Sequence, residues 1–300
     1  MNISLTPRIF IILVNWNGWQ DTIECLHSLD NLDYPNYSVI VVDNGSTDGS
    51  PEKISRAFPQ VHLIESDQNL GFAGGNNLGI EQALNEGTDY VWLLNNDTVV
   101  DPDALSHLVQ RMEKDTNIGI CGSKLIYYHQ RDTIQVLGGG SHNKWLATTN
   151  NFGQHQSVET SFNPQQIEEN LDFVIGASML VSRRFLNEVG WLSEDYFLYY
   201  EELDWGIRAK PQFSLGFAPE SVVYHKEGAS TGGNQLQRAN RSEKSDYYQL
   251  KNRLKFTYKF FPLYLPCAYL SIFYALINRV RRGQWKRIPM IIKLMFTFNK

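Results

Sequence analysis

The chain has 300 residues, of which 42% are hydrophobic and 20% charged, enough apolar material for a sizeable core. That composition excludes a disordered chain and fits one large domain with an appendage, or two small domains. The net charge of −5 hides a split, because all 32 acids precede residue 247 whereas residues 247–300 carry eleven Lys and Arg, which predicts a tail with its own partner.

The N-terminal segment, residues 1–8, lacks the basic, apolar and cleavage-site regions of a secretory signal. The apolar run that follows, residues 9–14, is too short to span a bilayer. Cys25, Cys121 and Cys267 lie far apart and fit neither a zinc knuckle nor a disulfide framework. We therefore expect the body of the protein in the reducing cytoplasm.

Short β-branched runs alternate with amphipathic segments through the first half of the chain, as in βαβ units around a mainly parallel sheet. Strands are predicted at residues 9–14, 39–42, 61–64 and 90–94, and helices at residues 22–29, 51–58, 77–85 and 104–114. In open parallel sheets, ligands bind where the strands end. Polar residues follow three of these strands, at 15–18, 43–46 and 95–98, so we expect one binding site there.

Asp97 is the candidate metal ligand. It follows the strand at 90–94, and its neighbours Asn95 and Asn96 are uncharged. Because only one carboxylate would neutralise a divalent cation there, the cation would keep positive charge to bind the phosphates of a nucleotide diphosphate. The alternative is a turn aspartate before the helix start at Asp101-Pro102.

Asp43 ends the strand at 39–42, where an exposed carboxylate can accept hydrogen bonds from a ribose hydroxyl or a base N–H. Asp48 and Ser50, in the same turn, are more simply turn and N-cap residues. Further along, the glycine-rich run 71–77 precedes a predicted helix and lets backbone approach an anion closely. It does not have the Walker or dinucleotide glycine spacing.

Residues 138–170 are polar and rich in Gly, Asn and Gln without periodicity, which is typical of a long functional loop or a small insertion. The pattern assigns no secondary structure to them. Regular patterning returns with a predicted strand at 173–181 and helices at 184–189 and 201–209.

Three acids, Glu201, Glu202 and Asp204, gather at the start of the last of these helices. Helical spacing places Glu201 and Asp204 on one face and directs Glu202 elsewhere. One of them is a candidate general base; the alternative is that they only complement the helix dipole.

His225 closes an apolar run and is either a metal ligand or structural. The polar stretch 227–245 is a candidate lid over a nucleotide.

The basic tail holds two apolar segments. The first, residues 260–277, is interrupted by Pro262 and Pro266 and is marginal for a membrane span of about 20 residues. Five basic residues separate it from the second, residues 288–298. We predict two amphipathic segments lying in the membrane interface with basic residues on anionic lipid. The alternative is that they pack on the catalytic domain or on a second subunit.

Five of these segments, in this order, resemble the inverting glycosyltransferases of family 2, and in particular their rhamnosyltransferase-like branch with the GT-A fold. The resemblance covers about residues 8–258. The matching segments are Val14-Asn15-Trp16-Asn17, residues 42–48, residues 69–73, Leu94-Asn95-Asn96-Asp97-Thr98, and the acidic cluster at 201–204 followed by His225.

The resemblance implies an α/β catalytic domain of the GT-A class over residues 1–245, with 138–170 as a variable acceptor region. Residues 246–300 form a helical, membrane-associating region. Asp97 belongs to a DxD-like motif whose first acid is replaced by Asn95, and with His225 it binds Mg²⁺ or Mn²⁺. The residues implied in donor binding are Val14, Asn15, Asn17, Asp43, Gly71, Asn76, Asn96 and Asp97.

Glu202 stands where the family usually has its catalytic aspartate, and Glu201 is the reserve candidate. The implied reaction is a single displacement that inverts the anomeric configuration. Gly74 replaces an arginine common in relatives, and the run 72–77 looks like rhamnosyltransferases that use dTDP-rhamnose; a UDP-sugar is the other donor considered. The implied acceptor is a saccharide, free or polyprenyl-linked, in bacterial surface polysaccharide synthesis, such as cell wall or O-antigen.

The same resemblance implies a peripheral location on the inner face of the plasma membrane and allows a homo-oligomer. A catalytically inactive, nucleotide-binding scaffold is the competing interpretation, because Asn95 and Glu202 depart from the family pattern. A nucleotide-dependent oxidoreductase is disfavoured because the first strand does not lead into a GxGxxG turn. Nucleic-acid binding is disfavoured because the body is acidic and the tail is interrupted by apolar stretches.

Overall fold

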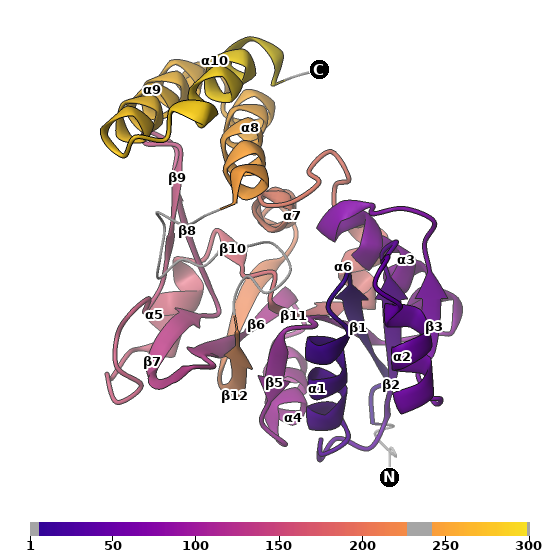
Figure 1. Cartoon of the computed structure of the whole chain (residues 1–300). Helices are drawn as coiled ribbons and strands as arrows, with labels where there is room; N and C mark the ends of the chain where they lie inside the picture. Colours follow the sequence, from indigo (N-terminus) through magenta and orange to yellow (C-terminus); the bar gives the residue numbers. More distant parts are fainter. Residues whose placement is uncertain (1–5, 227–241, 299–300) are drawn as a thin grey trace.

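The computed structural model describes residues 6–226 and 242–298 (Figure 1). Residues 227–241, which make up most of the lid predicted at 227–245, therefore lie outside the described residues. The elements in chain order are β1 (Ile9–Asn15), α1 (Trp19–Leu29), β2 (Tyr37–Asp43), α2 (Ser50–Ala57), β3 (His62–Glu65), α3 (Gly71–Asn85), β4 (Tyr90–Asn95), β5 (Thr98–Val100), α4 (Ala104–Lys114), β6 (Ile118–Tyr127), β7 (Gln130–Leu137), β8 (Gly139–Asn143), β9 (Thr148–Asn151), α5 (Pro164–Glu169), β10 (Phe173–Val174), β11 (Ser178–Ser182), α6 (Arg183–Glu188), α7 (Glu201–Ala209), β12 (Ser214–His225), α8 (Glu243–Phe260), η2 (Pro262–Tyr264), α9 (Leu265–Arg281), η3 (Trp285–Arg287) and α10 (Ile288–Thr297).

A nine-stranded sheet runs through the described body, in the order β3-β2-β1-β4-β11-β6-β12-β5, with β7 paired to β6. Strands β1 to β4 pair in parallel, and β12 is parallel to β6. Strand β11 lies between these groups and is antiparallel to both β4 and β6. The α/β class predicted from the sequence is confirmed, and the parallel strands bring their carboxyl ends to one edge.

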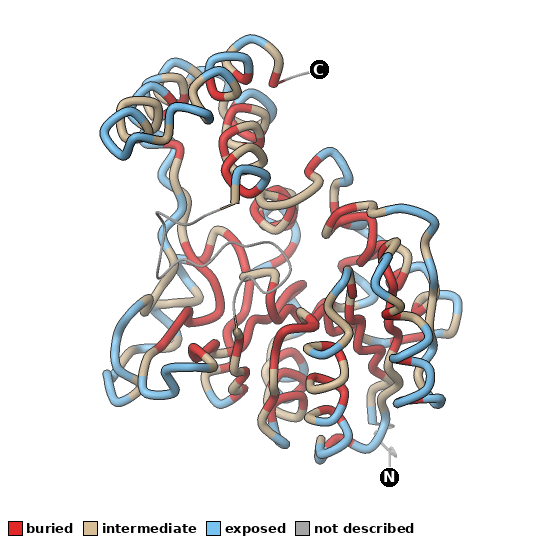
Figure 2. The backbone as a smooth tube through the Cα atoms, in the orientation of Figure 1, coloured by how far each residue is buried: buried red, intermediate tan, exposed pale blue. Residues whose placement is uncertain are grey.

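Both faces of the parallel strands are covered. In β1, Ile9, Ile11 and Leu13 belong to one apolar cluster, whereas Phe10 and Ile12 belong to the other. The first cluster includes side chains of α1, α2 and α4, and the second includes those of α3, α6 and α7. This two-sided burial explains why the strand is an unbroken apolar run, and Figure 2 shows it as a continuous buried band.

The glycine-rich run is not a loop before a helix, because α3 already begins at Gly71. A Cβ on Gly75 would lie 2.8 Å from Val14, and one on Gly79 would lie 2.5 Å from Ile12. These glycines therefore let the helix approach β1 closely. The strand predicted at 173–181 is also wrong in part, since it divides into β10 and β11, which join different sheets.

The segment without predicted structure contains regular elements. Strands β8 and β9 form an antiparallel hairpin that joins β10 in a small three-stranded sheet, and α5 follows. Gly139 permits the close pairing, since a Cβ there would lie 1.9 Å from the Phe173 carbonyl oxygen. The hairpin tip reaches the C-terminal helices, where Trp145 packs edge-on against Tyr264 at 4.7 Å.

The C-terminal helices share a small core of their own. Leu250 and Leu254 of α8 pack with Ala268 and Ile272 of α9 and with α10. The two apolar segments predicted in the tail are thus helices that pack on α8. Within the described residues, the stretch Pro262–Arg281 is long and apolar enough to cross a membrane, judged by length and composition alone.

Candidate functional site

A cavity of about 970 Å³ opens at the carboxyl edge of the sheet and extends beneath α8 and β9. The predicted residues that line it are Val14, Gly71, Asn76, Asn96, Asp97, Glu201, Glu202 and His225. Residues from distant parts of the chain therefore meet in one space. Three other predicted residues, Asn15, Asn17 and Asp43, are not among its lining residues.

Asp97 and His225 lie side by side on neighbouring strand ends. Asp97 Oδ1 is 3.2 Å from His225 Nε2, and both side chains are at least nine-tenths buried. The other ring nitrogen, Nδ1, lies 2.9 Å from Gln135 Oε1. An amide oxygen accepts, so this contact fits the tautomer protonated at Nδ1, whose Nε2, 3.3 Å from Asn95 Nδ2, can serve as a metal ligand beside Asp97. Nothing in the sequence pattern pointed to Gln135.

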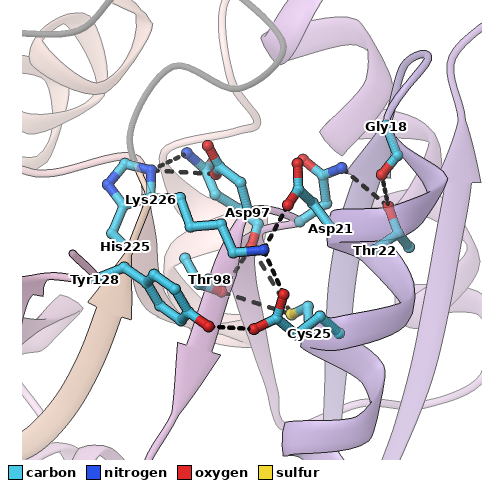
Figure 3. Close-up of polar contacts among 12 residues, drawn as sticks. Gly18, Asp21, Thr22, Cys25, Asp97, Thr98, Tyr128, His225 and Lys226 are labelled. Atoms are coloured by element: carbon cyan, nitrogen blue, oxygen red, sulfur yellow. Dashed lines mark hydrogen bonds and ion pairs between the residues drawn. The ribbon is translucent and has the colours of Figure 1, made fainter.

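The strand that carries His225 is fixed against helix α1 (Figure 3). The backbone N–H of Lys226 donates to the Asp97 carbonyl oxygen at 3.0 Å, and its ammonium donates to Asp21 and Glu24 of α1. Burial opposes the ammonium charge, but these carboxylates outweigh it and raise the pKa of Lys226. The resulting ion pairs hold the Asp97–His225 pair in register.

The Asp97–His225 pair fits a divalent cation that also binds substrate oxygens. A carboxylate oxygen and an imidazole nitrogen suit Mn²⁺, and the carboxylate also suits Mg²⁺. In the described parts of the chain, no group of three or more His, Cys, Asp or Glu is placed to hold a metal. Two protein ligands would leave most coordination positions for phosphate oxygens and water.

Asp43 lies behind the cavity wall. Its Oδ1 accepts from Asn15 Nδ2 at 2.7 Å, its Oδ2 accepts from the Ser46 N–H at 2.9 Å, and the residue is 2% exposed. Asn17, with a φ of 51°, accepts from the Thr47 N–H at 2.8 Å. These residues brace the turns after β1 and β2, while their neighbours Val14 and Asn44 line the cavity.

The two adjacent glutamates at the start of α7 face the same cavity. Burial and the neighbouring charge of Glu202 raise the pKa of Glu201 well above its usual range. Burial also raises the pKa of Glu202, but backbone hydrogen bonds and a hydrogen bond with Glu201 oppose that rise. Both pKa values are therefore raised, and the buried pair holds a proton more strongly than an exposed glutamate does.

Asp204 has a different environment from that expected. It does not line the cavity, although Glu201 and Asp204 were predicted to share a face and Glu202 to point elsewhere. Its fully buried carboxylate accepts from Arg208 Nε and from Lys259 Nζ, each at 2.6 Å. Asp204 thus ties α7 to α8, and the cavity pair is formed by Glu201 and Glu202.

The backbone before the glutamates is strained. Tyr199 and Tyr200 have φ values of 69° and 77°, a region that costs non-glycine residues about 1 kcal/mol or more each. Asn252 of α8 compensates by donating to the carbonyls of Leu198 and Tyr199 at 2.8 and 3.0 Å. The Tyr199 hydroxyl lies 2.8 Å from Ser245 Oγ. The sequence offered no local signal for this support, which comes from 50 residues away.

Residues 10–190 match the family described as Glycosyl transferase family 2. The chain is 27% identical over 267 residues to an N-acetylglucosaminyl-diphospho-decaprenol L-rhamnosyltransferase of Mycobacterium tuberculosis, covering 83% of this chain and 86% of that one. It is 26% identical over 208 residues to the low-salt glycan biosynthesis hexosyltransferase Agl10 of Haloferax volcanii, covering 69% and 63% of the two chains.

Two solved structures share the fold at 16% sequence identity. The mannosyltransferase PcManGT of Pyrobaculum calidifontis, in complex with GDP-Man and Mn²⁺, matches with a TM-score of 0.58 over 97% of this chain and 86% of that one. GalNAc-T7 with UDP, GalNAc and Mn²⁺ matches with a TM-score of 0.59 over 84% and 51%. These likenesses confirm the GT-A arrangement expected from the sequence.

Proposed function

The chain belongs to glycosyl transferase family 2, and from that premise we propose that it transfers a sugar from a nucleotide-diphosphate donor to an acceptor hydroxyl with inversion of the anomeric carbon. One observation carries the proposal. The Asp97–His225 pair, from the strand ends, and the Glu201–Glu202 pair, from the start of α7, line one cavity. One pair suits a diphosphate with its cation, and the other suits an acceptor hydroxyl.

Glu202 is the proposed base. Its support is its position in the cavity lining, at the place where the resemblance puts the catalytic acid, and burial raises the pKa of both carboxyls of the pair. Glu202 would take the proton of the acceptor hydroxyl as that oxygen attacks the anomeric carbon from the side opposite the diphosphate. A divalent cation at Asp97 and His225 would neutralise charge on the departing diphosphate.

The proposed donor is dTDP-rhamnose, with a UDP-sugar as the competing donor. Its support is the rhamnosyltransferase among the relatives and the run Gly71–Asn77, of which Gly71 and Asn76 line the cavity. Asn15, Asn17 and Asp43 would contribute by shaping the turns around the nucleoside. Val14, Gly71, Asn76 and Asn96 would contact the donor directly from the lining.

The proposed acceptor is a saccharide or a lipid-linked saccharide used in bacterial surface polysaccharide synthesis. The proposed catalytic domain is residues 1–245, with 138–170 near the acceptor and 246–300 as the helical appendage. Helices α9 and α10 would dock on the inner membrane surface, because Leu270, Phe273 and Phe296 are exposed and no acid follows Asp246. Co-sedimentation with anionic but not zwitterionic vesicles is the expected behaviour.

A thermal-shift panel of dTDP-, UDP- and GDP-linked sugars, with and without Mn²⁺, tests the function. Stabilisation by one nucleotide sugar, dependent on Mn²⁺ and lost in Asp97→Ala, supports the transferase and narrows the donor. If no nucleotide sugar shifts the melting temperature, the transferase proposal is refuted; a shift without transfer activity favours the inactive, nucleotide-binding scaffold. A product that retains the donor's anomeric configuration would refute the single displacement.

A further inference from the structure

Arg253 of α8 lines the same cavity as the glutamate pair, but no carboxylate lies within 4.0 Å of it among the described residues. Its Nη1 donates to Ser271 Oγ of α9 at 3.2 Å. Its Nε is buried and has no hydrogen-bond partner. A guanidinium with an unmet donor in a cavity wall costs free energy unless an acceptor arrives.

The other cations on this helix are satisfied. Lys255 pairs with Asp195 at 3.2 Å, and Lys259 pairs with Asp204 at 2.6 Å. Lys244, which also lines the cavity, lies over the rings of Trp16 and Phe197 at 4.7 and 4.8 Å. Arg253 is therefore the cavity-lining cation whose charge the described protein does not balance with a carboxylate or an aromatic face.

Arg253 lies on α8, the helix whose Asn252 supports the backbone directly before the glutamates. It is one helical turn before Phe256, whose ring packs at 5.5 Å from that of Tyr200, directly before the acid pair. Its partner Ser271 belongs to α9, and β9 (Thr148–Asn151) also lines the cavity. Figure 1 shows α9 above β9 and beside α8.

We propose that Arg253 binds a phosphate group of the acceptor, so that the acceptor is a sugar carried on a lipid phosphate or diphosphate. The sugar hydroxyl would lie at Glu202, the phosphate at the guanidinium, and the lipid would pass toward the exposed apolar residues of α9. The guanidinium group suits phosphate oxygens, and a phosphate would supply the hydrogen-bond acceptor that Nε lacks. This inference rests on the proposed transferase function and names its acceptor class.

The test is a binding titration with decyl diphosphate, a sugar-free probe, against protein saturated with dTDP or UDP and Mn²⁺. Decyl glucoside, which has the same alkyl chain but no phosphate, is the control probe. Saturation with nucleotide fills the donor site, so binding of the probe reports a second phosphate site. The test variants are Arg253→Gln and Arg253→Lys. The control is Lys251→Gln, which removes one charge from the same helix at a residue that does not line the cavity.

We expect Arg253→Gln to weaken decyl diphosphate roughly 10- to 100-fold, the range for a hydrogen-bonded charge pair. Arg253→Lys should retain part of the affinity, while decyl glucoside and nucleotide binding stay within about twofold. Lys251→Gln should match the wild type. Equal binding of the two probes by the wild type overturns the proposal, as does a loss of both probes together in Arg253→Gln.

A fall in nucleotide affinity in Arg253→Gln would instead place Arg253 in the donor site and also overturn the proposal. Failure of the transferase function gives a different result. In that case dTDP and UDP do not bind with Mn²⁺ in the wild type or in any variant, and the decyl diphosphate titration can still be run with Mn²⁺ alone.

Discussion

The sheet edge formed by β1 to β4 and the wall formed by α7, α8 and the β8–β9 hairpin contribute to the cavity in different ways. At the sheet edge, lining residues such as Val14, Asn44 and Asn96 lie at or just after the end of a strand, so strand and site residue are neighbours in sequence. At the opposite wall, the position of Glu201 and Glu202 depends on Asn252, about 50 residues away. The proposed donor side is thus specified locally, whereas the proposed acceptor side depends on long-range contacts.

Substitution of Asp97 is the most severe test of this difference between the sheet edge and the opposite wall. If the sheet edge binds the diphosphate through a cation, Asp97→Ala should lower transfer by about 1,000-fold or more, since roughly 4 kcal/mol of charge stabilisation is lost. Mn²⁺-dependent stabilisation by nucleotide should disappear as well. Steady-state kinetics and thermal shift measure the two effects, with Asp103→Ala, an exposed acid near α4, as the control.

The second test separates the two glutamates. Glu202→Gln should lower kcat by roughly 100- to 10,000-fold, the range for loss of a general base, and leave nucleotide affinity unchanged. Glu201→Gln keeps a hydrogen-bond donor in place of the protonated carboxyl, so its loss should be smaller. The reverse order of effects would make Glu201 the base.

The pH profile adds a check on Glu202. A base must be ionised, and burial raises the pKa of Glu202, so the acidic limb of kcat/KM should lie above the usual glutamate range near 4.5. Activity should rise with pH through that limb. A limb at or below about pH 4.5 would contradict a buried base.

The third test concerns support of the acid pair from α8. Asn252→Ala removes two hydrogen bonds to the Leu198 and Tyr199 carbonyls and frees the strained tyrosine pair. We expect kcat to fall about tenfold to a hundredfold, because small displacements of a base are costly, while the Kd for nucleotide stays unchanged. Thr257→Ala is the matched control, since its buried hydroxyl bonds only to Arg253 O of its own helix.

If Asn252→Ala weakens nucleotide binding as much as it lowers kcat, the two walls are not independent. That result would contradict the contrast between a local donor edge and a remotely supported acceptor wall. An unchanged kcat would show that the tyrosine backbone keeps its conformation without α8.

The two regions also differ in how well their sequence predicts them. Strands β1 and β4 are buried on both faces and were predicted within one residue at each end, because apolar runs bounded by polar turns are a local signal. The β8–β9 hairpin was not predicted, since it is built from Gly, Thr and Asn and is defined by its pairing with β10. Its strands have no apolar alternation to detect.

The same distinction holds within the site. Asp97 follows β4 and His225 ends β12, so their type and position were visible in the sequence, but Gln135, which contacts His225, is 90 residues from it. Helical spacing alone placed Asp204 with Glu201, because it took no account of Arg208 and Lys259, which draw Asp204 to the other side. Charge partners from other elements, rather than the helical period, decided which acid faces the cavity.

The smallest expected effect is on the melting temperature of Glu201→Gln, which should rise at high pH. Burial and the charge of Glu202 raise the folded-state pKa of Glu201, so its contribution to stability is full below the unfolded value near 4.5 and is lost as pH rises through the folded value. Glu201→Gln removes that loss. Its melting temperature should equal the wild type's near pH 4 and exceed it at pH 8, by roughly 2–4 °C.

The exposed Glu159→Gln is the matched control for this prediction and should show no pH-dependent difference. A Glu201→Gln variant that is less stable than the wild type at pH 8 would mean that the Glu201 carboxylate is ionised and satisfied in the folded protein. Glu201 would then compete with Glu202 for the acceptor proton. A stabilised but slower variant would show that the acceptor wall keeps a destabilising buried acid for catalysis, while the donor edge satisfies its buried Asp43 with two hydrogen bonds.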